Sequence, residues 1–529
     1  ALTAATTAAN NTALGWQAGV ATTTGASNSF IGKYSGAANT TGDYNVALGA
    51  NALDANTTAS NNIAVGYAAL GANTTGTSNT AVGFQALNLN ATSDNNTAIG
   101  HNALENNVTD SNTAVGYYSL RANTTGDNNV AVGVLALNAN TTAASNTAVG
   151  RSALAVNTTG NYNVAVGTYA LDANTTANNN TALGSSSLSA NTTGASNVAI
   201  GANALTANTT TTGSVAIGAE ALTASYANTN VAIGYQAMGA NTTGTDNVAV
   251  GTNALDANTS ASNNTAVGDN ALGANTTGAS NTGVGKDALL LNTTGTRNVA
   301  MGLSALEQNT TADDNTAVGF SALGANTTGT QNVAVGTYVL DANTTGDYNA
   351  ALGYQSLSAN TTADSNTALG YKSMLTNTTG ASNVAVGDSA LRANTTADEN
   401  TAVGYSALTT NTTGAYNTAV GKGAAEKNTT GAHNVAVGRL ALNDNTTGDN
   451  NVALGRSALE SNTTADNNTA VGYAALAVNS TGTYNVAVGA YALDASTTAN
   501  SGTAIGFNAL GSNTTGQSNT AVGSLALDA

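Results

Sequence analysis

The chain has 529 residues, of which 7% are charged and 4% aromatic, and its formal net charge at neutral pH is −17. It contains no cysteine, which excludes disulfides and thiolate metal sites. The eleven basic residues stand mostly alone in the sequence. They argue against nucleic acid as a partner, because phosphate binding needs clustered Lys and Arg. No run of 18 apolar residues is present, so no membrane span is expected.

The chain consists of a seventeen-residue sequence repeat from end to end. Its approximate consensus is Asn-Thr-Ala-Val-Gly-x-x-Ala-Leu-x-x-Asn-Thr-Thr-Gly-x-x. Its glycine occurs in 31 copies from Gly15 to Gly523, and the two intervals of sixteen residues are Gly100 to Gly116 and Gly218 to Gly234. Such a period is typical of a solenoid or fibre. Residues 1–529 are therefore predicted to form a single continuous repeat array. Both ends fall at nearly the same phase of the repeat, which predicts an excerpt of a longer chain or an uncapped filament subunit.

Residues 451–467 show the elements expected in one unit, in chain order. The segment 451–455, Asn-Val-Ala-Leu-Gly, alternates apolar and small residues as a strand does, and its glycine is suited to a corner with positive φ. A second short strand is expected to carry Ala458 and Leu459. The Asn-Thr-Thr stretch from Asn462 then turns the chain back, since Asn and Thr side chains readily bond to backbone.

Two short strands and two turns make one coil, and the predicted fold is an all-β parallel β-solenoid, or β-roll, of about 31 coils of 17 residues. Stacked coils would lie about 4.8 Å apart. One coil cannot stand alone, because ordering its residues costs more conformational entropy than its few apolar side chains return on burial. Neighbouring coils must supply the rest through hydrogen bonds and further burial.

The strand alanine before the Val, Leu or Ile position is nearly constant, as at Ala47, Ala64 and Ala81, with Phe30 and Gly283 as departures. A constant small residue on one face of a strand suggests close contact. The simplest candidate is a second chain packed about a common axis, and the alternative is a lone solenoid whose thin wall tolerates Ala.

The Asn-(Thr/Val)-Ala-(Val/Ile)-Gly strand, for example Asn197-Val198-Ala199-Ile200-Gly201, resembles the head repeats of trimeric autotransporter adhesins. It is also similar to repeats of phage tail-fibre-like proteins. The resemblance covers the whole chain and implies a left-handed parallel β-roll of three chains, displayed at a cell surface to bind host or matrix. The repeat is longer than usual for that family, and the extra residues fall in the Asn-Thr-Thr-Gly turn.

The sequence offers little for catalysis. Its two histidines, His101 and His433, are far apart in the array and occupy variable positions, and Asp313-Asp314 and Asp398-Glu399 read as solvated corners. Neither calcium-binding nonapeptides nor a dinucleotide-binding fingerprint is found. We therefore expect no enzyme, no catalytic or metal-binding residues and no cofactor.

Asn-Thr-Thr is also an N-x-Thr glycosylation acceptor, although a turn already explains its recurrence. The candidate glycosylation residues are Asn56, Asn73, Asn123, Asn174, Asn292 and Asn462.

Tyrosines give the best binding hypothesis, because many follow the repeat glycine directly. Such rings could stack on sugars or partner surfaces, or could merely cover coil corners. The candidate exposed binding aromatics are Tyr67, Tyr117, Tyr235, Tyr354, Tyr405 and Tyr473.

The predicted function is an extracellular structural fibre or adhesin shaft at the cell surface. It would act as a rigid rod or filament for surface attachment or matrix. The expected partners are further copies of the chain, as a homotrimer or an end-to-end filament, and a carbohydrate or cell-surface receptor. Three alternatives stay open: a phage receptor-binding tail fibre on a virion, an ice-binding solenoid, and a monomeric functional amyloid.

Overall fold

Each coil contributes one strand, formed by the three residues between the repeat's first asparagine and its glycine. Val46–Leu48 is an example, with β-branched and apolar residues that favour an extended backbone. The strand ends at Gly49, whose φ is +139°, and a Cβ there would lie 2.4 Å from the carbonyl oxygen of Gly66 in the next coil. Conformation and close approach both require glycine, which confirms the predicted corner.

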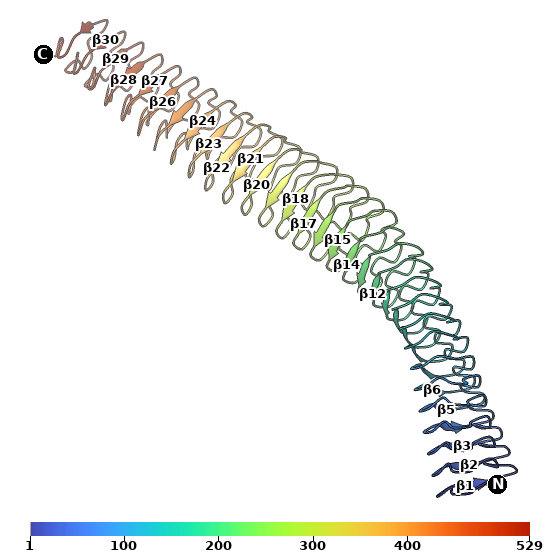
Figure 1. The fold of residues 1–529 in the computed structure, drawn as a ribbon. Coiled ribbons are helices and arrows are strands. Elements are labelled where there is room, and N and C mark those ends of the chain that lie inside the picture. The colour runs from blue at the N-terminus through green and yellow to red at the C-terminus, as the bar shows by residue number, and fades with distance from the viewer. Residues whose placement is uncertain (1, 529) are drawn as a thin grey trace. The chain divides into compact units, whose positions relative to one another are not determined.

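The computed structural model describes residues 2–528, and within them it contains 31 strands and no helix. The chain divides into two units, Ala1–Asn263 and Asn264–Ala529. Each unit is a stack of coils whose strands lie side by side along one wall (Figure 1). The parallel β-solenoid predicted from the repeat is thus confirmed.

The strands of the first unit are β1 (Thr12–Leu14), β2 (Ser29–Ile31), β3 (Val46–Leu48), β4 (Ile63–Val65), β5 (Thr80–Val82), β6 (Thr97–Ile99), β7 (Thr113–Val115), β8 (Val130–Val132), β9 (Thr147–Val149), β10 (Val164–Val166), β11 (Thr181–Leu183), β12 (Val198–Ile200), β13 (Val215–Ile217), β14 (Val231–Ile233) and β15 (Val248–Val250). Those of the second unit are β16 (Thr265–Val267), β17 (Thr282–Val284), β18 (Val299–Met301), β19 (Thr316–Val318), β20 (Val333–Val335), β21 (Ala350–Leu352), β22 (Thr367–Leu369), β23 (Val384–Val386), β24 (Thr401–Val403), β25 (Thr418–Val420), β26 (Val435–Val437), β27 (Val452–Leu454), β28 (Thr469–Val471), β29 (Val486–Val488), β30 (Thr503–Ile505) and β31 (Thr520–Val522).

Sequential strands within a unit pair in parallel and in register. Ala148, Ala165 and Ala182, the centres of β9, β10 and β11, are successive partners. The register also holds across the shortened coils: Ala98 of β6 pairs with Ala114 of β7, and Ala216 of β13 with Ala232 of β14. The missing residue is therefore taken from the turn and leaves the strand wall intact.

The predicted second strand at Ala-Leu is wrong. This wall is a series of turns in which residues with positive φ alternate with others; Asn51 has φ +57° and Leu53 has φ +52°. The N–H groups of Asn51 and Leu53, which both have positive φ, bond to opposite neighbours in the stack. Asn51 N donates to Lys33 O in the preceding coil at 2.9 Å, and Leu53 N donates to Ala69 O in the following coil at 3.0 Å. The wall is therefore hydrogen-bonded on both sides without being a sheet.

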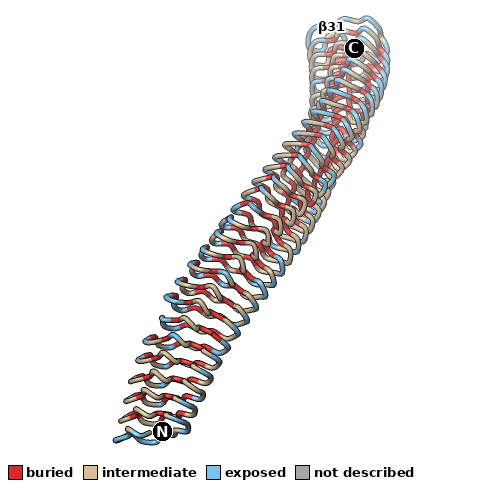
Figure 2. The backbone as a smooth tube through the Cα atoms, turned by 90° about the vertical axis from the view of Figure 1, so that its right-hand side faces the viewer, coloured by how far each residue is buried: buried red, intermediate tan, exposed pale blue. Residues whose placement is uncertain are grey.

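The core lies between these two walls and consists of the strand alanine and the Ala-Leu pair. Ala47, Ala52 and Leu53 are each 0% exposed. In each unit buried residues lie along the inside of the coils and exposed residues along their edges (Figure 2). The expectation that the strand alanine faces a second chain is therefore wrong, because it packs inside its own coil. The strand's first and third residues face outward instead.

Candidate binding surface

The first and third residues of the strands form an outward surface on each unit, which we call the outer strand face. Its third position is Leu, Ile, Val or Met in every strand of the described chain, and its first position is Thr or Val apart from Ser29, Ile63 and Ala350. Val333 is 44% exposed and Leu352 49%. No charged residue occurs at either position in the described strands. A long uncharged stripe of half-exposed aliphatic side chains is characteristic of an interaction surface.

The outer strand face has a depression in the second unit at β21. Ala350 stands there where the other strands of this unit carry Thr or Val, and the depression of about 230 Å³ is lined by β20, β21 and β22. Leu352 and Leu369 border it. The lining is almost wholly aliphatic, so it suits an apolar side chain and offers no chemistry for catalysis.

A second surface follows the residue after each strand-ending glycine, which we call the corner column. The six tyrosines predicted as exposed binding aromatics lie in it, and all are exposed: Tyr67, Tyr117, Tyr235, Tyr354, Tyr405 and Tyr473. Their exposure is confirmed, and their binding role stays a prediction.

Four consecutive coils bring Tyr67 and Tyr117 into one stack of rings. The centroid distances are 5.4 Å from Tyr67 to Phe84, 4.9 Å from Phe84 to His101 and 5.4 Å from His101 to Tyr117. Because these rings cover one another's faces, they present mainly their edges to solvent. A hydrogen bond with Tyr118 raises the pKa of Tyr117.

The other predicted tyrosines are less continuous. Tyr354 stacks on Tyr371 at 5.7 Å, and Tyr473 meets Tyr491 edge-on at 5.1 Å. The Tyr405 ring faces the Lys422 ammonium at 5.4 Å. Tyr235 has no ring or cation partner within the described chain. Face-on stacking of a sugar is therefore more accessible at isolated rings than in the four-ring stack.

The corner column also holds most of the basic residues: Lys33, Arg151, Lys286, Lys422, Arg439 and Arg456. The last three occupy consecutive coils and are exposed. The basic residues stand mostly alone in the sequence, so the prediction from sequence missed this cluster. Residues seventeen positions apart in the sequence lie on adjacent coils in the structure. Their shared repeat position was the signal that could have found them.

The six asparagines predicted as glycosylation candidates lie inside the coils. Each is 0% exposed: Asn56, Asn73, Asn123, Asn174, Asn292 and Asn462. In each, Nδ2 donates both to the Asn of the preceding coil and to a carbonyl three residues on. A sugar on Nδ2 would have no space and would remove these bonds, so the folded coil is incompatible with glycosylation there.

Both histidines lie in exposed aromatic stacks, and His433 lies almost parallel to Tyr416 at 4.8 Å. Among residues 2–528, no group of three or more His, Asp or Glu side chains is arranged to hold a metal ion. The same residues contain no helix long and apolar enough to cross a membrane.

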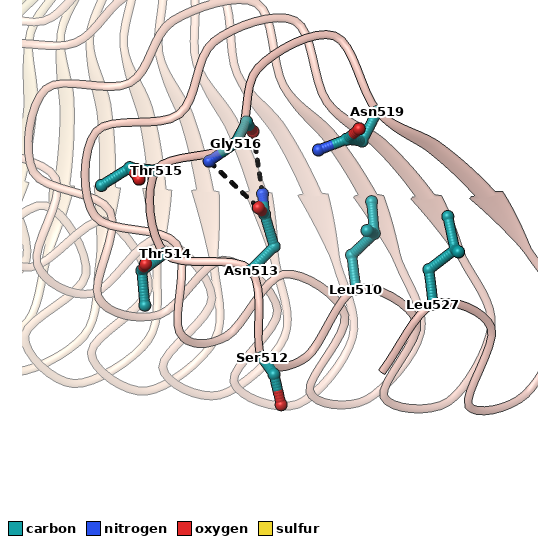
Figure 3. A pocket seen from close by; sticks show the side chains of 8 residues that line it. All are labelled: Leu510, Ser512, Asn513, Thr514, Thr515, Gly516, Asn519 and Leu527. Carbon is teal, nitrogen blue, oxygen red and sulfur yellow. Dashed lines mark hydrogen bonds between the residues drawn. The ribbon is translucent and has the colours of Figure 1, made fainter. Parts of the chain in front are cut away.

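The last coils surround an open depression of about 350 Å³ between Leu510, Asn513 and Leu527 (Figure 3). The Asn513 side chain forms hydrogen bonds within its own turn: Nδ2 donates to Gly516 O at 2.9 Å, and Oδ1 accepts from Gly516 N at 3.0 Å. These residues occupy repeat positions that are buried in the other coils. The depression is thus the uncovered cross-section of a coil and adds no separate chemistry.

No protein-family model matches the chain, and no curated protein matches its sequence.

Proposed function

We propose that this chain is an extracellular structural fibre or adhesin shaft, without catalytic activity, that associates with further copies of itself through the outer strand face. The proposed assembly is a homotrimer with left-handed winding, as the sequence resemblance implies. It would give a stiff element for surface attachment or matrix. The corner column would be free to meet a carbohydrate or a cell-surface receptor.

One observation carries the proposal: in every described strand the third residue of the outer strand face is aliphatic and the first is uncharged, and both are partly or fully exposed. Val46 is 40% exposed and Leu48 46%, and the same pattern recurs at Val333 and Leu352. Burial of apolar surface contributes about 25 cal/mol per Å², so a contact repeated in every coil would sum to a large association free energy. A solvent-facing surface in a repeat array would be expected to drift toward polar and charged residues, as the corner column does.

The native mass of the assembly tests this proposal. Analytical ultracentrifugation should give three chains for the unchanged protein. Val333→Lys with Leu352→Lys should weaken association, because two charges would be buried in the contact. Thr345→Lys is the matched control, since Thr345 is exposed in the Asn-Thr-Thr turn away from the strand. A strictly single-chain particle, or equal effects of both variants, would refute it.

A ladder of exposed threonines favours a second candidate, ice binding. In the second unit the second Thr of Asn-Thr-Thr is exposed in fourteen successive coils, from Thr277 to Thr498. The first Thr is engaged within the stack, as where Thr293 Oγ1 donates to Thr310 O at 2.9 Å. The exposed hydroxyls thus form one regular column at the coil spacing. Absence of thermal hysteresis in the unchanged protein would remove this candidate, and loss of hysteresis in Thr362→Lys with Thr379→Lys would support it.

A further inference from the structure

Lys422, Arg439 and Arg456 form a ladder of three positive charges on consecutive coils. They follow Gly421, Gly438 and Gly455, which end β25, β26 and β27, and all three are exposed. Parallel strands lie about 4.8 Å apart, so these side chains leave the backbone about one strand spacing from one another. Three of the eleven basic residues of a chain with net charge −17 are thereby gathered on one edge.

The fold leaves these charges uncompensated, although it pairs basic residues elsewhere. Lys427 Nζ lies 2.8 Å from Asp444 Oδ1, and in the same corner column Lys286 Nζ lies 3.4 Å from Asp269 Oδ2. Within the described chain, no carboxylate forms an ion pair with any residue of the ladder. Like charges at this spacing repel one another. A bound anion would relieve that repulsion.

The carboxylates of the same three coils, Glu426, Asp444 and Glu460, follow the buried wall residues at a different repeat position. Asp444 is engaged by Lys427, and Glu426 Oε2 accepts from Asn443 Nδ2 at 3.2 Å. Two of the three acids nearest in sequence therefore have other partners.

Aromatic rings hold both ends of the ladder. The Lys422 ammonium lies 5.4 Å from the centre of the Tyr405 ring, and the Arg456 guanidinium lies 5.5 Å from that of Tyr473. A cation over a ring is attracted to its face. Two long side chains are thus restrained before a ligand arrives, which lowers the entropy lost on binding.

We propose that Tyr405, Lys422, Arg439, Arg456 and Tyr473 form a binding site for an anionic polysaccharide that lies along the stack. The guanidinium groups bind its carboxylate or sulfate groups, since their planar donor pairs match these anions. The sugar repeat of an extended polysaccharide is comparable with the coil spacing of about 4.8 Å, so anionic groups along the chain can reach the cations of the ladder. The tyrosines restrain the cations at either end and offer the sugars the ring surface that those cations leave uncovered.

The extent of the ladder favours this ligand over nucleic acid. One coil beyond Tyr405 the corner column carries Asp388, and one coil beyond Tyr473 it carries Ala490. A protein gains affinity for nucleic acid by neutralising many phosphates. The ladder supplies only three cations, and the corner-column residues on either side of it carry no positive charge. A short run of anionic sugars is the better match.

The test measures binding of the full chain to dextran sulfate, to polygalacturonate and to neutral dextran by titration calorimetry at low ionic strength. The variant is Lys422→Gln, Arg439→Gln and Arg456→Gln together. The matched control is Lys33→Gln, Arg151→Gln and Lys286→Gln, which removes the same charge from the same column at coils that are not adjacent. Native mass is measured for all three proteins, so loss of assembly is separated from loss of the site.

The unchanged protein should bind at least one anionic polysaccharide and not neutral dextran. The ladder variant should lose at least about tenfold in affinity, as expected when three charge-assisted contacts are removed, and the control should change by less than about twofold. Sulfate and carboxylate recognition are told apart by which polymer binds. Equal losses in both variants, no binding to either polymer, or tighter binding of a single-stranded oligonucleotide would overturn the proposal.

Discussion

Asn45 and Asn56 donate their side-chain amides to one carbonyl oxygen, that of Ala59, at 2.8 Å and 3.0 Å. Asn45 precedes the strand and Asn56 opens the Asn-Thr-Thr turn, and both are 0% exposed. Each also reaches the preceding coil: Asn45 N donates to Asn28 Oδ1, and Asn56 Nδ2 donates to Asn39 Oδ1, both at 2.8 Å. Two asparagines per coil therefore bind the coil across its width and to its neighbour, satisfying polar atoms that water cannot reach.

Replacing Asn56 by Asp should open this arrangement locally. The acceptors Asn39 Oδ1 and Ala59 O would lose a donor and a carboxyl group would be buried, which should lower the free energy of local opening by about 3 kcal/mol. Hydrogen exchange of residues 39–73 is the suitable measurement, since long repeat arrays do not unfold in one step. Asn61→Asp is the control, because Asn61 is exposed. Equal loss of protection in both variants would contradict the stabilising role of the Asn56 hydrogen bonds.

Ser496 replaces the asparagine that stands at the Asn56 position of other coils, and it offers the opposite experiment. Its Oγ and the Oδ1 of Asn479 are buried without a hydrogen-bond partner within the described chain. Ser496→Asn would supply an Nδ2 for Asn479 Oδ1 and should stabilise residues 479–516 by about 1 kcal/mol. Increased exchange protection there is the expected result, with exposed Ser501→Asn as the control. Reduced protection would mean that this coil cannot take the larger side chain.

Much of the coil follows from the repeat alone. The glycine period gives the stacking and the register, and the strand is centred on the Ala of each Asn-x-Ala-x-Gly segment, as at Ala165. The glycine corner was also predictable, since Gly66 has φ +134°. Variation after that glycine indicated exposure of residues such as Tyr67, which the structure confirms.

Two features of the coil could not be predicted from the sequence: which face of the strand is buried, and the backbone conformation of the Ala-Leu wall. In a three-residue strand of apolar side chains, alternation does not say which face is inside; Leu53 fills the interior from the opposite wall and leaves room only for Ala. The left-handed backbone at Leu53 is unusual for a branched residue. One signal was present, because Gly19 and Gly36 occupy the Leu position in their coils with φ +58° and +57°.

Gly283 and Gly285 stand two residues apart and should respond oppositely to alanine. Gly283 replaces the strand alanine, and an added Cβ would lie 3.4 Å from Leu272 Cγ and 3.2 Å from Ala288 O. Gly283→Ala should therefore stabilise its coil by about 0.5 kcal/mol, because glycine weakens a strand interior. Gly285 has φ +132°, and its Cβ would lie 2.5 Å from Gly302 O, so Gly285→Ala should destabilise by at least about 2 kcal/mol. Hydrogen-exchange protection of residues 265–302 measures the stability of both variants. A change of the same sign in both would refute the prediction that they differ in direction.

Phe30 is accommodated by the loss of two leucines. It replaces the strand alanine and is 0% exposed, and a Cβ on Gly36 or Gly19 would lie 2.4 Å or 2.8 Å from its ring. Phe30→Ala alone should leave a cavity and cost about 3–5 kcal/mol locally, whereas Gly36→Leu alone should clash. Combining Phe30→Ala with Gly19→Leu and Gly36→Leu restores the common repeat, so the triple variant should be more stable than either single one. Additive losses in chemical denaturation would refute this coupling.

Among the aspartates that follow a wall leucine are Asp54, Asp172, Asp256, Asp341 and Asp494. Burial raises the pKa of each carboxyl. A raised pKa in the folded state means that folding favours the protonated form. The stability contributed is thus complete below the unfolded pKa and is lost as pH rises through the folded value.

Asp54→Asn should therefore stabilise its coil at pH 7 and have little effect at pH 3. Asp314 gives the opposite sign, because the hydrogen bond from Arg297 lowers the pKa of its carboxyl. Its contribution is present above the unfolded pKa and is lost as pH falls through the folded value, so Asp314→Asn should destabilise at pH 7 only. Hydrogen-exchange protection of the residues around each substitution, measured at pH 3 and pH 7, tests both predictions. A loss of stability for Asp54→Asn at pH 7 would show that its backbone hydrogen bonds outweigh the desolvation of its carboxylate.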